Sequence, residues 1–186
     1  LPLLPPGLRA FALYVQAHHL YLKKNYTQSI GVAEATLSMG AASYPIPAIY
    51  LHLIAVMDYM RLKKTDLAQD HLLAAWEIAR PDDLIEGFGE HHGLMGAMLE
   101  AVIKPRWPED SKGWRDIHNP DTGQQVADNL TTTEFAVAML MVQDWTCEEI
   151  ASHMGVSAST VRRHQAQIKK KLQVKNRREL VEYMLP

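Results

Sequence analysis

Cysteine is almost absent from this chain, which has one cysteine, Cys147, among 186 residues. A single cysteine excludes an internal disulfide and any zinc site built from several cysteines, and it suits the reducing cytoplasm. The longest clean apolar run, residues 135 to 142, is far shorter than the roughly 18 to 20 residues of a membrane span. The chain starts at Leu1 without a signal peptide's features, which indicates a fragment. We expect a soluble, cytoplasmic protein with no membrane partner.

Constellations that carry catalysis or bind metals are also lacking. No nucleophile is accompanied by a base and an acid in a recognisable pattern, so we expect no enzyme activity and no cofactor. Two histidine pairs, His18-His19 and His91-His92, resemble metal ligands. Neighbouring residues on a helix point about 100° apart, and no cysteine or spaced acidic partner completes a ligand shell. The sequence therefore predicts no metal site.

Acidic residues are missing from one long segment near the end of the chain. Residues 158 to 178 contain eight Lys or Arg and no Asp or Glu. The preceding part, residues 1 to 129, has 11 basic and 15 acidic side chains, whereas residues 130 to 186 have 8 and 6. The overall pI of about 6.5 therefore hides a local cationic surface, of the kind that nucleic acid attracts.

The first part of the chain has the apolar spacing of packed helices. We expect a helical domain over residues 1 to 103, with helices at 8–24, 26–39, 46–62, 65–80 and 82–103. The tripeptide Leu-Lys-Lys occurs at residues 22 to 24 and again at 62 to 64. Ala68, Leu72 and Ala75, followed by Pro81, resemble the second helix of a tetratricopeptide repeat. A short TPR-like repeat domain is our interpretation, and an ordinary α-bundle is the alternative.

Residues 104 to 129 interrupt the helical pattern with three prolines and two glycines, which marks a linker between domains. Within it, residues 114 to 127 have the form of two short strands around a turn, in which Pro120 presets φ and Gly123 accepts positive φ. The sequence predicts a small β-hairpin here, with irregular linker as the alternative.

Four helices are expected in the last domain, residues 130 to 186, at 132–143, 147–154, 158–172 and 177–185. Three helix starts have a capping residue followed three positions later by a Glu. These are Thr131 with Glu134, Thr146 with Glu149, and Asn176 with Glu179. Ser157 caps the remaining helix, and Gly155 permits the positive φ that ends the helix before it. The second and third helices and the turn at 155–157 form a helix-turn-helix, typical of DNA readers.

The helix at 158–172 has one apolar and one basic side. At 100° per residue, Val161, Gln165, Ile168 and Leu172 face the core. The outward face and its flanks carry the residues that we expect to meet DNA. The candidates for base edges in the major groove are Arg162, Arg163 and Gln167. The candidates for phosphates are Ser159, Thr160, His164, Lys169, Lys170 and Lys171. A merely solvated helix face is the alternative, and His164 equally suits packing against the preceding helix.

The C-terminal residues resemble the LuxR-type helix-turn-helix domain of bacterial transcription regulators. The resemblance rests on Leu130-Thr131-Thr132-Thr133-Glu134, Glu149-Ile150-Ala151, Val156-Ser157, Thr160-Val161-Arg162-Arg163-His164, Ile168, Lys171-Leu172, Val174 and Arg177. It implies a four-helix domain that reads operator DNA with its third helix and dimerises through its last. The helical-repeat domain upstream is similar in layout to MalT-like members of the family.

We therefore expect a sequence-specific transcription regulator that binds double-stranded DNA as a homodimer and senses an effector or protein through its helical domain. RNA polymerase is a further candidate partner. The dimer surface is expected on the last helix, because its apolar residues offer more surface than one face of so short a helix can bury. These residues are Val181, Tyr183, Met184 and Leu185. Two alternatives are a sigma-factor-like promoter module, which would bind polymerase as a monomer, and an interaction scaffold in which the repeats do the work.

Overall fold

The protein is helical throughout the residues that its computed structural model describes, which are 3–91, 93–95, 97–109 and 130–184. No strand occurs among these residues, so the all-α class predicted from the sequence is confirmed for them. The chain divides into two compact units, Leu1–His91 and His92–Pro186, which are described separately. Within the described ranges, no helix is long and apolar enough to cross a membrane.

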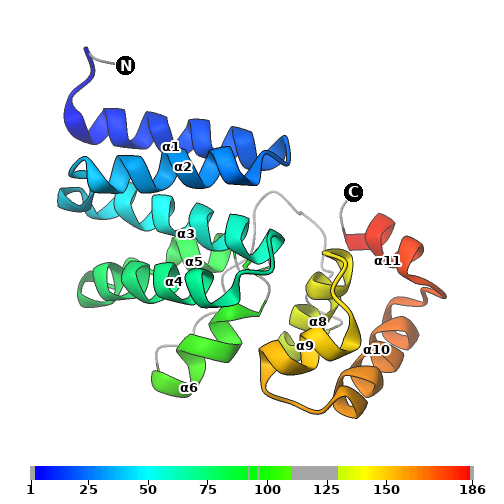
Figure 1. Cartoon of the computed structure of the whole chain (residues 1–186). Coiled ribbons are helices and arrows are strands. Elements are labelled where there is room, and N and C mark those ends of the chain that lie inside the picture. Colours follow the sequence, from blue (N-terminus) through cyan, green and yellow to red (C-terminus); the bar gives the residue numbers. More distant parts are fainter. Residues whose placement is uncertain (1–2, 92, 96, 110–129, 185–186) are drawn as a thin grey trace. The chain divides into compact units, whose positions relative to one another are not determined.

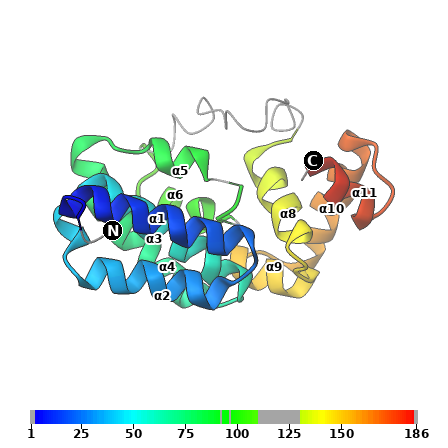
Figure 2. The same ribbon diagram turned by 90° about the horizontal axis from the view of Figure 1, so that it is seen from above.

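Unit 1 is built on four helices that lie side by side in two successive hairpins (Figure 1). They are α1 (Pro6–Leu22), α2 (Tyr26–Ser38), α3 (Pro45–Arg61) and α4 (Thr65–Ala79). Figure 2 shows the same four helices running alongside one another from above. Helix α3 packs against α1, α2 and α4. Two short 3₁₀ helices, Ala41–Ser43 and Arg80–Asp82, and the one-turn α5 (Glu86–Glu90) complete the unit.

The two hairpins of unit 1 repeat with a period of 39 residues. Each first helix ends in a left-handed lysine, Lys24 (φ 61°) and Lys63 (φ 56°). Positions 39 residues apart are buried in both copies, including Tyr14 and Leu53, Ala17 and Val56, Ser29 and Ala68, Ala33 and Leu72, and Thr36 and Ala75. The tripeptide repeat at 22–24 and 62–64 has a spacing of 40 and is therefore one residue out of structural register.

The single helix expected over residues 82 to 103 is not formed. Helix α5 stops at Glu90, and after a series of turns the chain resumes as a π-helical segment, η3 (Leu99–Ile103), and the short α6 (Lys104–Arg106). Glycines in this segment lower its helix propensity. Gly93 lies where a Cβ would be 3.0 Å from the Phe135 ring, so a larger residue there would need the ring to shift.

The boundary of the compact units thus lies at His91 and His92, upstream of the linker at 104–129 that the sequence predicts. Helix η3 packs against α9. The buried residues in and just before η3 are Met95, Ala97, Met98, Leu99, Val102 and Ile103. The β-hairpin predicted at 114–127 and the dimer residue Leu185 lie outside the described residues.

The last four helices of unit 2 follow the predicted spans to within one residue. They are α8 (Thr132–Val142), α9 (Cys147–Met154), α10 (Ala158–Leu172) and α11 (Arg177–Met184). Helix α8 packs against α10 and α11, and α9 packs against α10. Their shared core contains the fully buried Val137, Ile150, Val161, Ile168 and Leu180. This arrangement fixes which side of α10 faces solvent.

Candidate nucleic-acid interface

The turn between α9 and α10 is set by local hydrogen bonds. Thr146 and Glu149 form a complete capping box, in which each side chain accepts from the other's backbone N–H. At the other end of α9, Gly155 has φ 64°, the left-handed conformation that glycine adopts without strain. Ser157 then caps α10 by accepting from the Thr160 N–H at 3.2 Å. These contacts confirm the predicted helix-turn-helix geometry.

Helix α10 buries the side that the sequence predicts. Val161 and Ile168 are fully buried and Leu172 is nearly so. Gln165, the polar residue on this side, is half-buried and accepts a hydrogen bond from the Cys147 thiol at 3.3 Å. Cys147 therefore links α9 to α10, which gives the single cysteine of the chain a structural contact.

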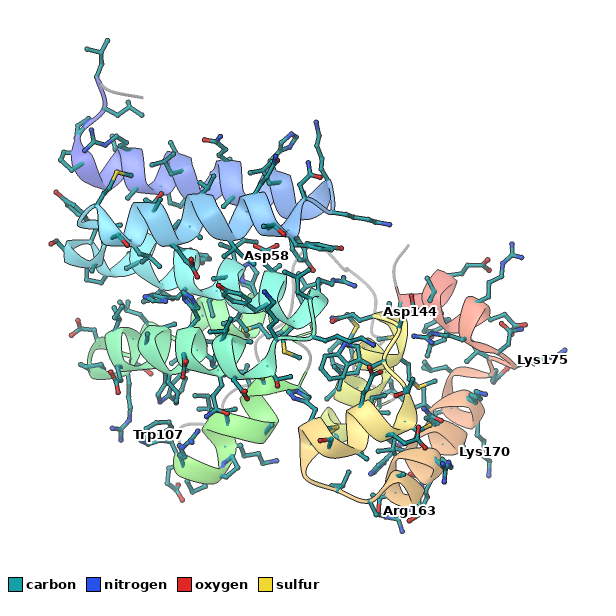
Figure 3. All side chains as sticks on the ribbon, viewed as in Figure 1. Asp58, Trp107, Asp144, Arg163, Lys170 and Lys175 are labelled. Atoms are coloured by element: carbon teal, nitrogen blue, oxygen red, sulfur yellow. The ribbon has the colours of Figure 1, made fainter. Side chains whose placement is uncertain are left out.

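The opposite side of α10 is exposed and cationic. The exposed residues on this side include Ser159, Arg163, Gln167 and Lys170. Helix α10 itself contains no Asp or Glu. Figure 3 shows the side chains of Arg163 and Lys170 extending away from the helix toward solvent. Guanidinium and amide groups on an exposed helix face have the donors and acceptors needed to read base edges in a major groove.

Arg162 lies on the flank of this face and has a partner within the unit. Its Nη2 is 2.8 Å from Oε1 of Glu148, in the first turn of α9, and both side chains are more than 60% exposed. Exposed ion pairs of this kind contribute at most about 1 kcal/mol. The weak contact with Glu148 therefore orients Arg162 but would not prevent it from binding a ligand. Arg163 is the better placed candidate for such a contact because it lies on the outward face itself.

Lys171, which the sequence places among the phosphate contacts, is tied to the core of the domain. Its Nζ is 2.6 Å from Oε2 of Glu134, whose side chain is only 4% exposed. Glu134 also closes the capping box of α8 by accepting from the Thr131 N–H at 2.7 Å. Burial raises the pKa of this carboxyl, but hydrogen bonds from Lys171 and Thr131 outweigh it and leave the pKa lowered. Lys171 thus neutralises a buried charge.

The other predicted phosphate contacts differ in how accessible they are. The Ser159 and Thr160 hydroxyls both lie 2.8 Å from the Ser157 hydroxyl at the start of α10. Lys169 is half-buried, and His164 is half-buried with an Nδ1 that is buried and has no hydrogen-bond partner. The buried nitrogen favours packing of His164 within the domain, one of the two roles considered for it.

Helix α11 presents less apolar surface than the sequence indicates. Met184 is 8% exposed and packs into unit 2 itself, so its side chain is not part of an exposed surface. Val181 is half-buried and Tyr183 is 41% exposed. These two are the described residues that remain for a dimer surface on α11.

Sequence reasoning missed the anchor of this helix. The Arg177 guanidinium donates to the Met141 carbonyl and lies 3.0 Å from the Asp144 carboxylate. Both contacts join α11 to the end of α8, more than 30 residues away in sequence. Two signals pointed to Arg177: its place in the family resemblance, and its charge at the start of a helix, where a basic residue opposes the helix dipole and needs a nearby acceptor.

Residues 128–184 match the family model of the bacterial regulatory proteins of the luxR family. The match spans the four helices α8 to α11 and shows a LuxR-type helix-turn-helix domain at the C-terminal end of the chain. Comparison with curated proteins and with solved structures finds no match. No group of three or more His, Cys, Asp or Glu side chains in the described part of the chain is arranged to hold a metal ion.

Proposed function

We propose that this chain is a sequence-specific DNA-binding transcription regulator that reads the major groove with the exposed face of α10. The family match to DNA-binding regulators supports this function, and one observation about the structure carries the assignment to a face. Residues 158 to 172 of the acid-free segment are helical, and Val161, Ile168 and Leu172 are buried in the domain, so Arg163 and Gln167 are presented outward.

Within this proposal, the residues of α10 divide into two groups. Arg163 and Gln167 are exposed one turn apart on the outward face, where bidentate contacts with guanine and adenine edges are feasible, and Arg162 reaches the groove from its flank. Lys170 and Lys169 lie where an ammonium group meets phosphate, and the Ser159 and Thr160 hydroxyls add uncharged donors at the helix start. Lys171 is assigned to Glu134 rather than to DNA.

For unit 1 we propose a TPR-like sensing or protein-binding domain. The 39-residue structural period, with small residues such as Ser29, Ala33 and Ala68 between paired helices, supports a helical repeat. We further propose that the domain binds palindromic DNA as a homodimer through Val181 and Tyr183 of α11. RNA polymerase remains a candidate partner of a regulator of this kind.

A selection from random duplexes tests the proposed function. The full chain is mixed with random double-stranded DNA, and the retained duplexes are sequenced over successive rounds. A DNA reader enriches one motif, and Arg163→Ala should lose or broaden it. Arg178→Ala is the matched control, because Arg178 is 88% exposed and pairs with Glu182 on α11, away from α10. Enrichment of no motif by the wild type would refute the proposal and favour an interaction scaffold.

A further inference from the structure

Glu148 lies in the first turn of α9, beside the cationic helix α10. Its Oε1 accepts a hydrogen bond from Nη2 of Arg162 at 2.8 Å. The preceding residue, Cys147, donates to Gln165, which lies one turn beyond Arg162 on α10. The Glu148 carboxylate is therefore held next to a residue that the proposed function assigns to the major groove.

The other acidic residues of the C-terminal domain have different contacts. Residues 130 to 186 contain six acids. Three of them accept a backbone hydrogen bond at a helix start, namely Glu134, Glu149 and Glu179. Two pair with arginines of α11, namely Asp144 and Glu182. Glu148 is the remaining acid, and its partner is a candidate for reading bases. Its effect on binding should therefore depend on whether Arg162 meets a base or a phosphate.

On DNA without the preferred sequence, the Glu148–Arg162 pair should weaken binding. Sequence-independent binding comes almost entirely from cationic groups near phosphates. Arg162 contributes less to this attraction while Glu148 neutralises it. The carboxylate is also repelled by phosphates within about a Debye length, roughly 8 Å at physiological salt.

On the preferred sequence, the same pair should assist binding. A guanidinium has five N–H donors, and Nη2 of Arg162 is the nitrogen that contacts Glu148. The group can therefore give two N–H donors to a guanine edge while another stays on the carboxylate. A side chain that is already oriented loses less conformational entropy when it makes this contact.

We propose that Glu148 is a positioning residue that determines specificity. By pairing with Arg162, it presents the guanidinium to a base edge and suppresses its contact with phosphates. This inference rests on the proposed function, because it requires that α10 reads DNA. It adds that the preference for one sequence depends on an acid of α9, outside the helix that enters the groove.

Binding of the full chain to two duplexes tests the role of Glu148. One is the duplex selected from the random pool, the other is a scrambled version, and both are measured at several salt concentrations. Glu148→Gln should bind the scrambled duplex about two- to fivefold more tightly, because no exposed ion pair then competes for Arg162. Its salt slope of log K on that duplex should become steeper by up to about 0.9. The ratio of the two affinities should fall by a similar factor.

Glu148→Ala separates orientation from charge. Gln keeps an oxygen that can accept from Arg162, whereas Ala does not. Glu148→Ala should therefore also bind the selected duplex more weakly than Glu148→Gln does. Both variants replace an exposed side chain and leave the capping box of Thr146 and Glu149 intact, and circular dichroism checks that they fold.

Glu182→Gln is the matched control. Glu182 is 64% exposed and pairs with Arg178 on α11, so the substitution changes the net charge equally but away from α10. The affinity ratio should stay unchanged. When Arg162→Ala is also present, the gain of Glu148→Gln on the scrambled duplex should shrink to that of Glu182→Gln.

The outcomes distinguish this inference from the proposed function. A wild type that enriches no duplex would refute the proposed function and this inference with it. If a duplex is selected, an affinity ratio that changes no more in the Glu148 variants than in Glu182→Gln would overturn this inference alone. Equal weakening of both duplexes would also overturn it, because that result is expected if Glu148 only stabilises the start of α9 through the helix dipole.

Discussion

Replacing Asp58 with asparagine should stabilise unit 1, by an amount that grows with pH. Asp58 is fully buried on α3, and neither carboxylate oxygen has a hydrogen-bond partner. Figure 3 shows its position among the helices of unit 1. Burial raises the pKa of this carboxyl from its ordinary 3.8 to about 7, although the nearby Ser29 hydroxyl acts in the opposite direction. The folded protein therefore keeps Asp58 protonated at pH values where the unfolded chain does not.

The size of the effect follows from this difference in pKa. Because the folded-state pKa is raised, the stabilising contribution is complete below pH 3.8 and is lost as the pH rises to about 7. A gap of roughly three pH units corresponds to about 4 kcal/mol at 1.36 kcal/mol per unit. About two-thirds of it, or roughly 2 to 3 kcal/mol, falls between pH 5 and pH 8. An asparagine side chain cannot ionise, so the variant escapes this loss.

Urea unfolding of wild type and Asp58→Asn, followed by circular dichroism at several pH values from 5 to 8, measures the difference. Other groups titrate in this range with the opposite sign. Burial and then the neighbouring His71 lower the pKa of His52 to about 4, so its contribution is lost as the pH falls. Both proteins contain these other groups, so taking the difference in unfolding free energy at each pH cancels their contributions. A difference in unfolding free energy that stays constant from pH 5 to pH 8 would refute the reasoning.

Three further predictions concern unit 2. Gly155→Ala should lower the unfolding free energy by about 1 to 2 kcal/mol, because a φ of 64° strains an L residue even though its Cβ meets no atom within 4 Å. Lys171→Met should lower the unfolding free energy by about 1 to 3 kcal/mol, seen in calorimetry as a lower melting temperature, because it leaves the buried Glu134 carboxylate without Lys171. Lys170→Met should leave the melting temperature unchanged. A fragment of residues 92–186 should unfold more cooperatively than one of 130–186, because the shorter one uncovers Phe135; equal thermal transitions would contradict this.

The sequence predicted the C-terminal helices well because their signals are local. Thr131, Thr146 and Ser157 each determine a helix start through contacts three residues away, and Gly155 ends α9 by its own conformation. Helical periodicity then sufficed to assign Val161 to the core. The exposed side of α10 followed from these assignments without knowledge of any tertiary contact.

Contacts between distant residues could not be predicted from the sequence. Periodicity places Lys171 at the flank of α10 but does not reveal Glu134, which lies 37 residues earlier. Likewise, a lone Asp on a mostly apolar helix is normally expected at the surface. Helix α3 is buried on nearly all sides, however, so Asp58 is buried as well. The apolar spacing of residues 82 to 103 favoured one helix, but α5 ends at Glu90 and η3 begins only at Leu99.

The central claim is that the outward face of α10 reads DNA bases while Lys169 and Lys170 hold phosphates. One binding measurement tests it most directly. The affinities of wild type, Arg163→Ala and Lys170→Ala for the selected duplex and for a scrambled one are measured at several salt concentrations. Arg163→Ala should reduce the preference for the selected duplex, equivalent to about 1 to 3 kcal/mol. Lys170→Ala should keep the preference and reduce the salt slope of log K by about 0.9. Equal weakening of both duplexes by Arg163→Ala, with loss of preference in Lys170→Ala, would contradict the account.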